Sequence, residues 1–176
     1  WEKYGADGIT IHPRPDERHI TTQDVYDLNQ VVTTEFNIEG YPEERFMQLI
    51  KEIKPAQATL VPDPPNVLTS NAGWDTQLNY DLLKDICAEI NRYGVRTSIF
   101  VDTKLSNIEG AKKVGVDRIE FYTGPYADMY PIDKEKAILP YKIAAELCDE
   151  LKIGINAGHD LSLDNLKHFK SNIPSL

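Results

Sequence analysis

The chain has 176 residues, enough for one globular domain, and its 41% hydrophobic content can supply a sizeable core. Its 19 Lys and Arg residues against 28 Asp and Glu residues give a formal charge of -9. This charge repels the phosphates of nucleic acids and anionic lipids, and we see no basic patch that would compensate. We therefore expect no nucleic-acid partner.

The cysteines and the apolar runs bear on the cellular compartment. Cys87 and Cys148 each lie in a helical apolar pattern, where a free thiol usually serves as a small buried hydrophobic group. Two such cysteines favour a reducing compartment over a disulfide scaffold. No run approaches the roughly 18 apolar residues of a membrane span, and no basic-then-apolar leader opens the chain. These features predict a cytoplasmic protein with no membrane partner.

Short apolar runs of strand character alternate with helical patterns along the chain. The predicted strands are residues 7–12, 36–39, 57–61, 96–101, 118–122 and 152–156. The predicted helices are residues 21–32, 42–53, 80–94, 106–115, 134–151 and 162–169. Pro42 is expected in the first turn of its helix, Gly94 at a helix end and Ser162 at a helix start, and Pro140 is expected to begin or kink its helix.

Strand–helix alternation predicts a parallel sheet, because parallel neighbours need a crossover connection and a helix is the usual one. An open doubly wound sheet usually places a glycine-rich turn after its first strand, but this chain has HPRPDERH there and no P-loop. Polar residues instead follow several different strands, as in barrel enzymes. These residues are His12, Glu39, Asp102, Tyr122, Thr123, Asn156 and His159. The pattern favours a TIM (β/α)8 barrel.

Glu120 lies inside a predicted strand, between Ile119 and Phe121. Because side chains alternate along a strand, its carboxyl group should point to the face opposite those two apolar neighbours. A carboxylate facing a barrel interior needs a partner or a raised pKa. If Glu39 shares that surface, we expect the pKa of at least one of the two carboxyl groups to be raised.

The two ends of the chain bear on the number of strands. WEKYG resembles the last turn of a helix that Gly5 terminates, and HFKSNIPSL completes a helix where another strand would follow. Six strands with one more at each side make eight. We therefore expect residues 1–176 to form a single, partial TIM-barrel domain that lacks the first and last strands.

Several stretches resemble the pyridoxine 5'-phosphate synthases, a family of barrel enzymes of vitamin B6 biosynthesis. GADGITIHPRPDERHI resembles the segment around that family's second strand, and FNIE its third. KPAQATLVPDPPNVLTSNAGWD resembles the fourth strand and its loop, RIEFYTGPYAD the sixth and INAGHDL the seventh. The resemblance runs from about residue 4 to near residue 170, in the same order and with matching spacing.

The resemblance implies a transferase that condenses 1-deoxy-D-xylulose 5-phosphate with 3-amino-2-oxopropyl phosphate, without a cofactor or a metal. It implies that His12 and Glu39 accept protons, that His159 donates one and that Glu120 stabilises developing charge. It also implies binding of the sugar phosphate or the amino ketone by further residues, namely Arg14, His19, Thr69 and Asp160. Some family members carry glycine at the position of Asp160. The family forms homo-oligomers, octamers among them.

Other interpretations of the same residues stay open at this stage. The two histidines and two glutamates could bind a metal, as in sugar-phosphate isomerases and aldolases on barrels. The fold could also be a barrel that only binds a phosphorylated metabolite. Singly, Glu39 could pair with an arginine, Glu120 could pair with Arg14, and Asp102 could cap the helix that follows it. If the HPR stretch is extended, His12 and Arg14 point the same way. We assign no function to His168, which we expect on the exposed side of its helix.

Overall fold

The structure, a computed structural model, describes residues 1–63 and 72–176. It contains a six-stranded sheet in which every pair of neighbouring strands is parallel. The strands are β1 (Gly8–Ile11), β2 (Glu35–Gly40), β3 (Gln57–Leu60), β4 (Arg96–Val101), β5 (Arg118–Tyr122) and β6 (Gly154–Gly158). The helices are η1 (Glu2–Tyr4), α1 (Thr22–Val31), α2 (Glu44–Ile53), α3 (Tyr80–Arg92), α4 (Leu105–Val114), α5 (Gly124–Met129), α6 (Lys134–Leu151) and α7 (Leu166–Asn172).

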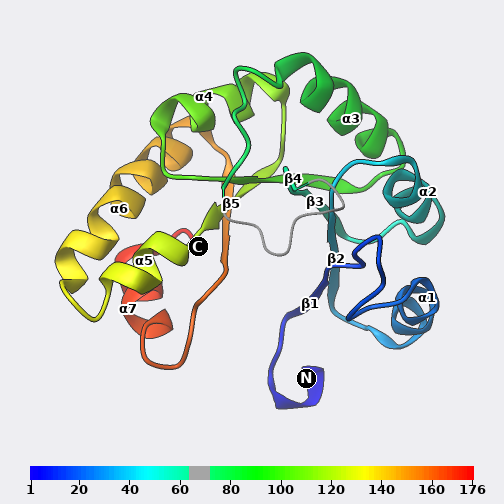
Figure 1. Ribbon diagram of the computed structural model, residues 1–176, viewed down its shortest axis with the longest axis horizontal. Coiled ribbons are helices and arrows are strands. Elements are labelled where there is room, and N and C mark those ends of the chain that lie inside the picture. Colours follow the sequence, from blue (N-terminus) through cyan, green and yellow to red (C-terminus); the bar gives the residue numbers. More distant parts are fainter. Residues whose placement is uncertain (64–71) are drawn as a thin grey trace.

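The strand order distinguishes the two predicted architectures. The six strands lie side by side in their sequence order, β1 to β6, whereas a doubly wound sheet reverses direction at a switch point. The helices form an outer arc around the curved sheet (Figure 1). The chain therefore forms a half-barrel of six parallel strands, which confirms the predicted α/β barrel class.

The two faces of the sheet differ in chemistry because side chains alternate along each strand. The outer face carries apolar side chains that pack under the helices, including Ile38, Ile99, Ile119 and Ile155, and all four are almost completely buried. The inner face is polar. A hydrogen-bonded series crosses it from strand to strand, as Asn37 donates to Thr10 and accepts from Thr59. The apolar core thus lies between sheet and helices, and the barrel interior is left for polar groups.

Several predicted boundaries were wrong, and local backbone geometry explains each. β6 begins at Gly154, two residues late, because Lys152 is in the left-handed conformation (φ 55°) that ends α6. α2 begins at Glu44, because the backbone turns tightly around Pro42, where the Glu43 N–H donates to the Tyr41 carbonyl (2.7 Å). Pro140 lies within α6, which begins at Lys134 with Asp133 as its N-cap.

Two further helix predictions need correction. α7 begins at Leu166, because the Asn165 side chain accepts a hydrogen bond from the Ser162 N–H (2.8 Å) in the turn before it. The sequence pattern predicts Leu82, Leu83, Ile86 and Ile90 on one face of α3, but Leu82 is 45% exposed and Cys87 lies on the buried face with Leu83 and Ile90. α5 was not predicted at all.

Other helix ends follow the sequence signals. Gly5 and Gly94 both have positive φ (91° and 79°), a conformation that favours glycine, and each ends a helix as predicted. Cys87 and Cys148 are buried and free. None of the helices in the described part of the chain is long and apolar enough to cross a membrane.

Candidate active site

His12 and Glu39 lie side by side where β1 and β2 end. The register pairs Ile11 with Ile38, so the next residues along both strands are His12 and Glu39. The His12 Nδ1 atom is 3.8 Å from a carboxylate oxygen of Glu39, which is too long for a hydrogen bond but leaves both groups facing the same space. The strand register alone therefore brings the two predicted proton acceptors together.

Glu39 and Glu120 meet across the interior of the half-barrel. Their strands, β2 and β5, are separated by two others, so in a flat sheet they would lie about 14 Å apart. In this structure the two carboxyl groups share a hydrogen bond. The curvature of the sheet brings together two carboxyl groups that lie 81 residues apart in the sequence (120 − 39 = 81).

Both carboxyl groups are buried, and burial raises both pKa values. The pKa of Glu39 rises to about 7, although the hydrogen bond from Glu120 and the charge of Arg14 act against the rise. The pKa of Glu120 is raised well above its usual value, first by burial and then by the negative charge of Glu39. These directions favour a proton on Glu120 that is donated in a hydrogen bond to Glu39.

The two histidines have lowered pKa values. Burial, followed by the positive charge of Arg14, lowers the pKa of His12 to about 4. Burial is also the main cause that lowers the pKa of His159, against the nearby carboxylates of Asp160 and Asp63. His12 is therefore neutral at pH 7, and its contact with Glu39 is not an ion pair there. A neutral imidazole can accept a proton.

His159 is held at the end of β6 by its ring and by its backbone. The imidazole packs against Phe100 and Tyr122, with ring centres 4.8 and 5.7 Å away. The buried Thr123 hydroxyl donates to the carbonyl groups of Gly158 and His159. The backbone of His159 is left-handed (φ 79°), which is unusual for a residue other than glycine. These contacts fix the direction of the imidazole.

Three of these groups border one cavity inside the half-barrel, with a volume of about 510 Å³, and His12 lines a smaller neighbouring pocket with Arg14. The lining of the larger cavity includes Glu39, Glu120 and His159, together with Asn37 and Asn156. Within residues 1–63 and 72–176, no three His, Cys, Asp or Glu side chains are placed as metal ligands would be. The cavity thus combines two carboxyl groups with raised pKa values and the imidazole of His159, with His12 beside Glu39, and this set is suited to proton transfer.

A family model for the pyridoxal phosphate biosynthesis protein PdxJ matches residues 1–176, the whole chain. The chain belongs to the PdxJ family. Pyridoxine 5'-phosphate synthase of Porphyromonas gingivalis is 58% identical over 175 residues, which cover 99% of this chain and 74% of that protein. The enzyme of the same name from Flavobacterium johnsoniae shows the same identity and coverage. Membership of the family makes the chain an enzyme of vitamin B6 biosynthesis.

A solved structure supports the fold independently of this family. Phosphoribosyl anthranilate isomerase, in complex with reduced 1-(o-carboxyphenylamino)-1-deoxyribulose 5-phosphate, superimposes with a TM-score of 0.53. The superposition covers 99% of this chain and 91% of that chain, at 14% sequence identity. At this identity the likeness concerns the fold alone.

The structure does not gather every residue that the resemblance to the PdxJ family implied. His12, Glu39, Glu120 and His159 converge, and the charge of Arg14 reaches three of them. His19 is exposed and lies against α1, beside Asp24 and Asp27. Asp160 is exposed, next to His159, and its backbone is left-handed (φ 56°), a conformation that favours glycine. Thr69 lies outside the described residues.

Some alternative interpretations of single residues are settled by their contacts. Asp102 accepts hydrogen bonds from the Lys104 N–H and the Asn107 side chain, both at 3.0 Å, so it orders the start of α4. Glu120 interacts with Glu39. His168 is partly buried against Tyr126 and Tyr130, not on an exposed side as expected.

The HPR stretch is not extended. The Arg14 N–H donates to the His12 carbonyl (2.9 Å), which folds the chain around Pro13. Even so, Arg14 stays close enough for its charge to lower the pKa of His12.

Sequence reasoning missed three residues that shape this site. Thr123 was noted only for following its strand, but its hydroxyl fixes the carbonyl of His159. Asn165 donates to the Asp160 carbonyl (3.1 Å) from the turn before α7. A Cβ atom on Gly158 would lie 2.5 Å from a carboxylate oxygen of Glu120, so only glycine leaves room for that group. The threonine that follows RIEFY and the glycine inside INAGHDL were the available signals.

Proposed function

We propose that the chain forms pyridoxine 5'-phosphate from 1-deoxy-D-xylulose 5-phosphate and 3-amino-2-oxopropyl phosphate, releasing phosphate and water, by acid–base catalysis without a metal. The observation that carries this proposal is the carboxyl pair of Glu39 and Glu120 facing neutral His12. Imine formation and ring closure require serial proton transfers near neutral pH. A carboxyl group with a pKa of about 7 can accept and return protons in that range.

The roles follow from charge and position. We assign proton acceptance to Glu39 and His12, since one titrates near neutrality and the other is neutral at pH 7. His159 approaches from the opposite edge of the sheet and acts as proton donor in this proposal. Glu120, which keeps its proton, stabilises negative charge by hydrogen bonding.

The substrate phosphates need positive charge in a protein with an overall charge of -9. Arg14 supplies a guanidinium group at the mouth beside His12 and is suited to a phosphate or a hydroxyl-rich sugar. We assign His19 and Thr69 to sugar phosphate binding and Asp160 to the amino ketone, as the resemblance implies. We also propose that the enzyme works as a cytoplasmic homo-oligomer, which light scattering of the purified protein tests as far as assembly is concerned.

The experiment supplies both substrates to the purified protein and follows pyridoxine 5'-phosphate by its absorbance. The matched pair of variants is Glu39→Gln and Glu150→Gln, because Glu150 is an exposed glutamate on α6. We expect Glu39→Gln to lower kcat about 10²–10⁴-fold, since only the proton-accepting capacity is removed, and Glu150→Gln to leave it unchanged.

Three results would overturn parts of this proposal. An unchanged rate in Glu39→Gln would remove Glu39 from the proton-transfer steps. Stoichiometric zinc or manganese in the purified protein, with activity lost to a chelator, would replace the metal-free mechanism by a metal-dependent one. Binding of both substrates without any product would leave only a phosphometabolite-binding barrel.

A further inference from the structure

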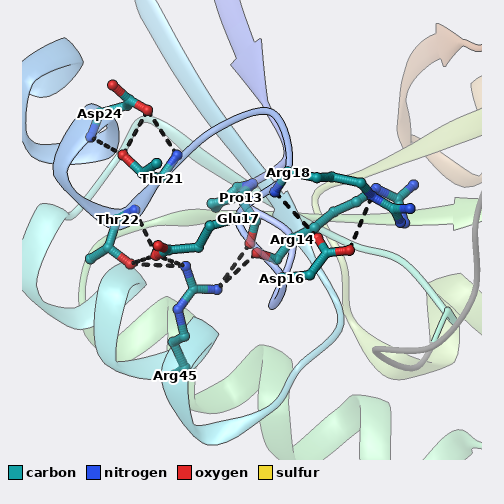
Figure 2. A network of polar contacts seen from close by, with 9 residues as sticks. All are labelled: Pro13, Arg14, Asp16, Glu17, Arg18, Thr21, Thr22, Asp24 and Arg45. Atoms are coloured by element: carbon teal, nitrogen blue, oxygen red, sulfur yellow. Dashed lines mark hydrogen bonds and ion pairs between the residues drawn. The ribbon is translucent and has the colours of Figure 1, made fainter.

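Arg45, at the start of α2, holds the loop that follows β1 (Figure 2). One guanidinium nitrogen, Nη1, donates to the carbonyl oxygens of Pro13 (3.2 Å) and Arg14 (3.4 Å). The other, Nη2, donates to the carboxylate of Glu17 (3.0 Å) and the hydroxyl of Thr22 (2.9 Å). A single side chain on α2 thus contacts the loop at three residues and the beginning of α1.

Glu17 completes this contact from the loop side. Its carboxylate accepts hydrogen bonds from the Thr22 N–H (2.9 Å) and the Thr22 hydroxyl (2.5 Å), in addition to Arg45. The backbone of Glu17 is left-handed (φ 52°), a conformation that residues other than glycine rarely adopt unless neighbouring contacts hold it. The Glu17 N–H donates to the Arg14 carbonyl (2.9 Å), so this conformation closes the turn that carries Arg14.

The far end of the loop is fixed by α1. Thr21 and Asp24 form a capping box, in which the Thr21 N–H donates to the Asp24 carboxylate (2.8 Å) and the Asp24 N–H donates back to the Thr21 hydroxyl (3.2 Å). The loop is therefore attached to the helix that follows it, and Arg45 attaches it to a second helix.

Through α2, the contacts of Arg45 link the loop after β1 to the strand that carries Glu39. α2 follows the end of β2, so Arg45 lies only six residues after Glu39 (45 − 39 = 6). The same loop carries His12 and Arg14 at its start. Four groups bear on His12: the charges of Arg14, Arg18 and His159, and the carboxylate of Glu39. The distances from His12 to these groups depend on how the loop packs against β2, which carries Glu39, and against α2, which carries Arg45.

We propose that Arg45 is a positioning residue that fixes Arg14 and His12 relative to Glu39 through the carbonyl oxygens of Pro13 and Arg14. This inference rests on the proposed function for its kinetic consequence, but its structural part stands on the contacts alone. The planar fork of the guanidinium group is required, because one side chain must reach four acceptors on two sides. A lysine carries the same charge without that geometry.

The test uses Arg45→Met and Arg45→Lys, with Arg92→Met as the matched control. Arg92 is an exposed arginine on α3 whose described hydrogen bond is to the Ala88 carbonyl of its own helix. The readout is the pKa of His12, followed by NMR titration of its imidazole. When the loop is released, Arg14 moves away and the pKa of His12 should rise by about half a unit or more in both Arg45 variants. Arg92→Met should leave it unchanged.

The kinetic readout separates positioning from chemistry. In both Arg45 variants we expect the KM for the sugar phosphate to rise about tenfold, with a smaller fall in kcat, because Arg14 is displaced while Glu39 stays in its strand. If the unaltered protein makes no pyridoxine 5'-phosphate, the proposed function fails, whereas the NMR titration still reports on Arg45.

A milder pair of variants keeps the test decisive if the Arg45 variants fail to fold. Thr22→Val removes the hydroxyl that Arg45 and Glu17 share, and Thr22→Ser retains it. We expect the pKa of His12 to rise in Thr22→Val and to stay at its original value in Thr22→Ser. The same pKa of His12 in the unaltered protein, in the folded Arg45 variants and in Thr22→Val would overturn the proposal.

Discussion

The carboxyl groups of Glu39 on β2 and Glu120 on β5 share one hydrogen bond inside the half-barrel. Neither residue could reach the other across a flat sheet, so their contact depends on the curvature of the sheet, which brings the groups of the candidate site together. The contact also separates their roles, because the group with the higher pKa keeps the proton. The predictions below test that division and the contacts that maintain it.

Glu120 should act on Glu39 as a neutral hydrogen-bond donor. Replacing Glu120 by Gln keeps a neutral donor, so the rising limb of the pH–rate profile, set by Glu39, should stay near pH 7. Replacing it by Leu removes the donor and should shift that limb to higher pH. The pH dependence of kcat/KM in both variants checks this. A limb that falls by a full unit in Glu120→Gln would show that Glu120 acts through negative charge instead.

The same pair should make the fold less stable as pH rises. A carboxyl group whose pKa is raised in the folded state keeps its proton after the unfolded chain has lost it. The loss of unfolding free energy therefore begins near pH 4.5 and continues to about pH 7 for Glu39, and the raised pKa of Glu120 adds to it. The difference in unfolding free energy between Glu120→Gln and the original protein should therefore change by roughly 1–3 kcal/mol in favour of Glu120→Gln as the pH rises from 5 to 8.

Urea unfolding of the original protein and of Glu120→Gln at pH 5 and pH 8 measures this difference in unfolding free energy. His12 acts in the opposite direction, since its pKa is lowered to about 4 and its contribution to stability increases as pH rises towards 6.5. Because His12 is present in both proteins, its contribution cancels in the comparison. A stability difference that is the same at pH 5 and pH 8 would contradict the raised pKa of Glu120.

Gly158 should be required for the position of Glu120. In Gly158→Ala the new methyl group would lie 2.5 Å from a carboxylate oxygen of Glu120, which must move. We expect kcat to fall at least tenfold and stability to fall by about 1–3 kcal/mol. Gly154→Ala is the control on the same strand, since its methyl group meets the flexible Arg118 side chain at the other end. Equal kcat values in the two variants would contradict this role of Gly158.

Thr123 should hold His159 through its hydroxyl group. Thr123→Val preserves the shape of this buried side chain but removes the donor to the carbonyls of Gly158 and His159. We expect stability to fall by about 1–3 kcal/mol and kcat to fall with it, because buried carbonyls lose a partner and the imidazole loses its direction. Thr123→Ser keeps the hydroxyl and should retain most of both. Steady-state kinetics and thermal unfolding of the two variants decide between them.

The sequence allowed the residues that face the site to be predicted better than the residues that hold them in position. Alternation along RIEFY placed Glu120 on the interior face, and the polar strand ends indicated His12, Glu39 and His159, because these signals depend only on strand periodicity and parallel order. That residues 1–176 form a partial domain lacking the first and last strands stays a prediction.

Contacts between segments far apart in the sequence could not be predicted in this way. Arg45 lies in a stretch that periodicity marks only as an amphipathic helix, and two of its four partners are main-chain carbonyls, which leave no sequence signal. The turn at Pro13 depends on one backbone hydrogen bond, so the extended HPR stretch, on which a common direction of His12 and Arg14 was conditional, is not formed. The late start of β6 similarly reflects the left-handed backbone of Lys152.

The most direct measurement is a crystal structure of the protein with 3-amino-2-oxopropyl phosphate bound. The account predicts that Glu39 and His159 contact this one ligand from separate strands, each within hydrogen-bond distance, and that Glu120 lies beside Glu39. A ligand that binds away from both residues, or that contacts His159 while Glu39 faces another surface, would contradict it.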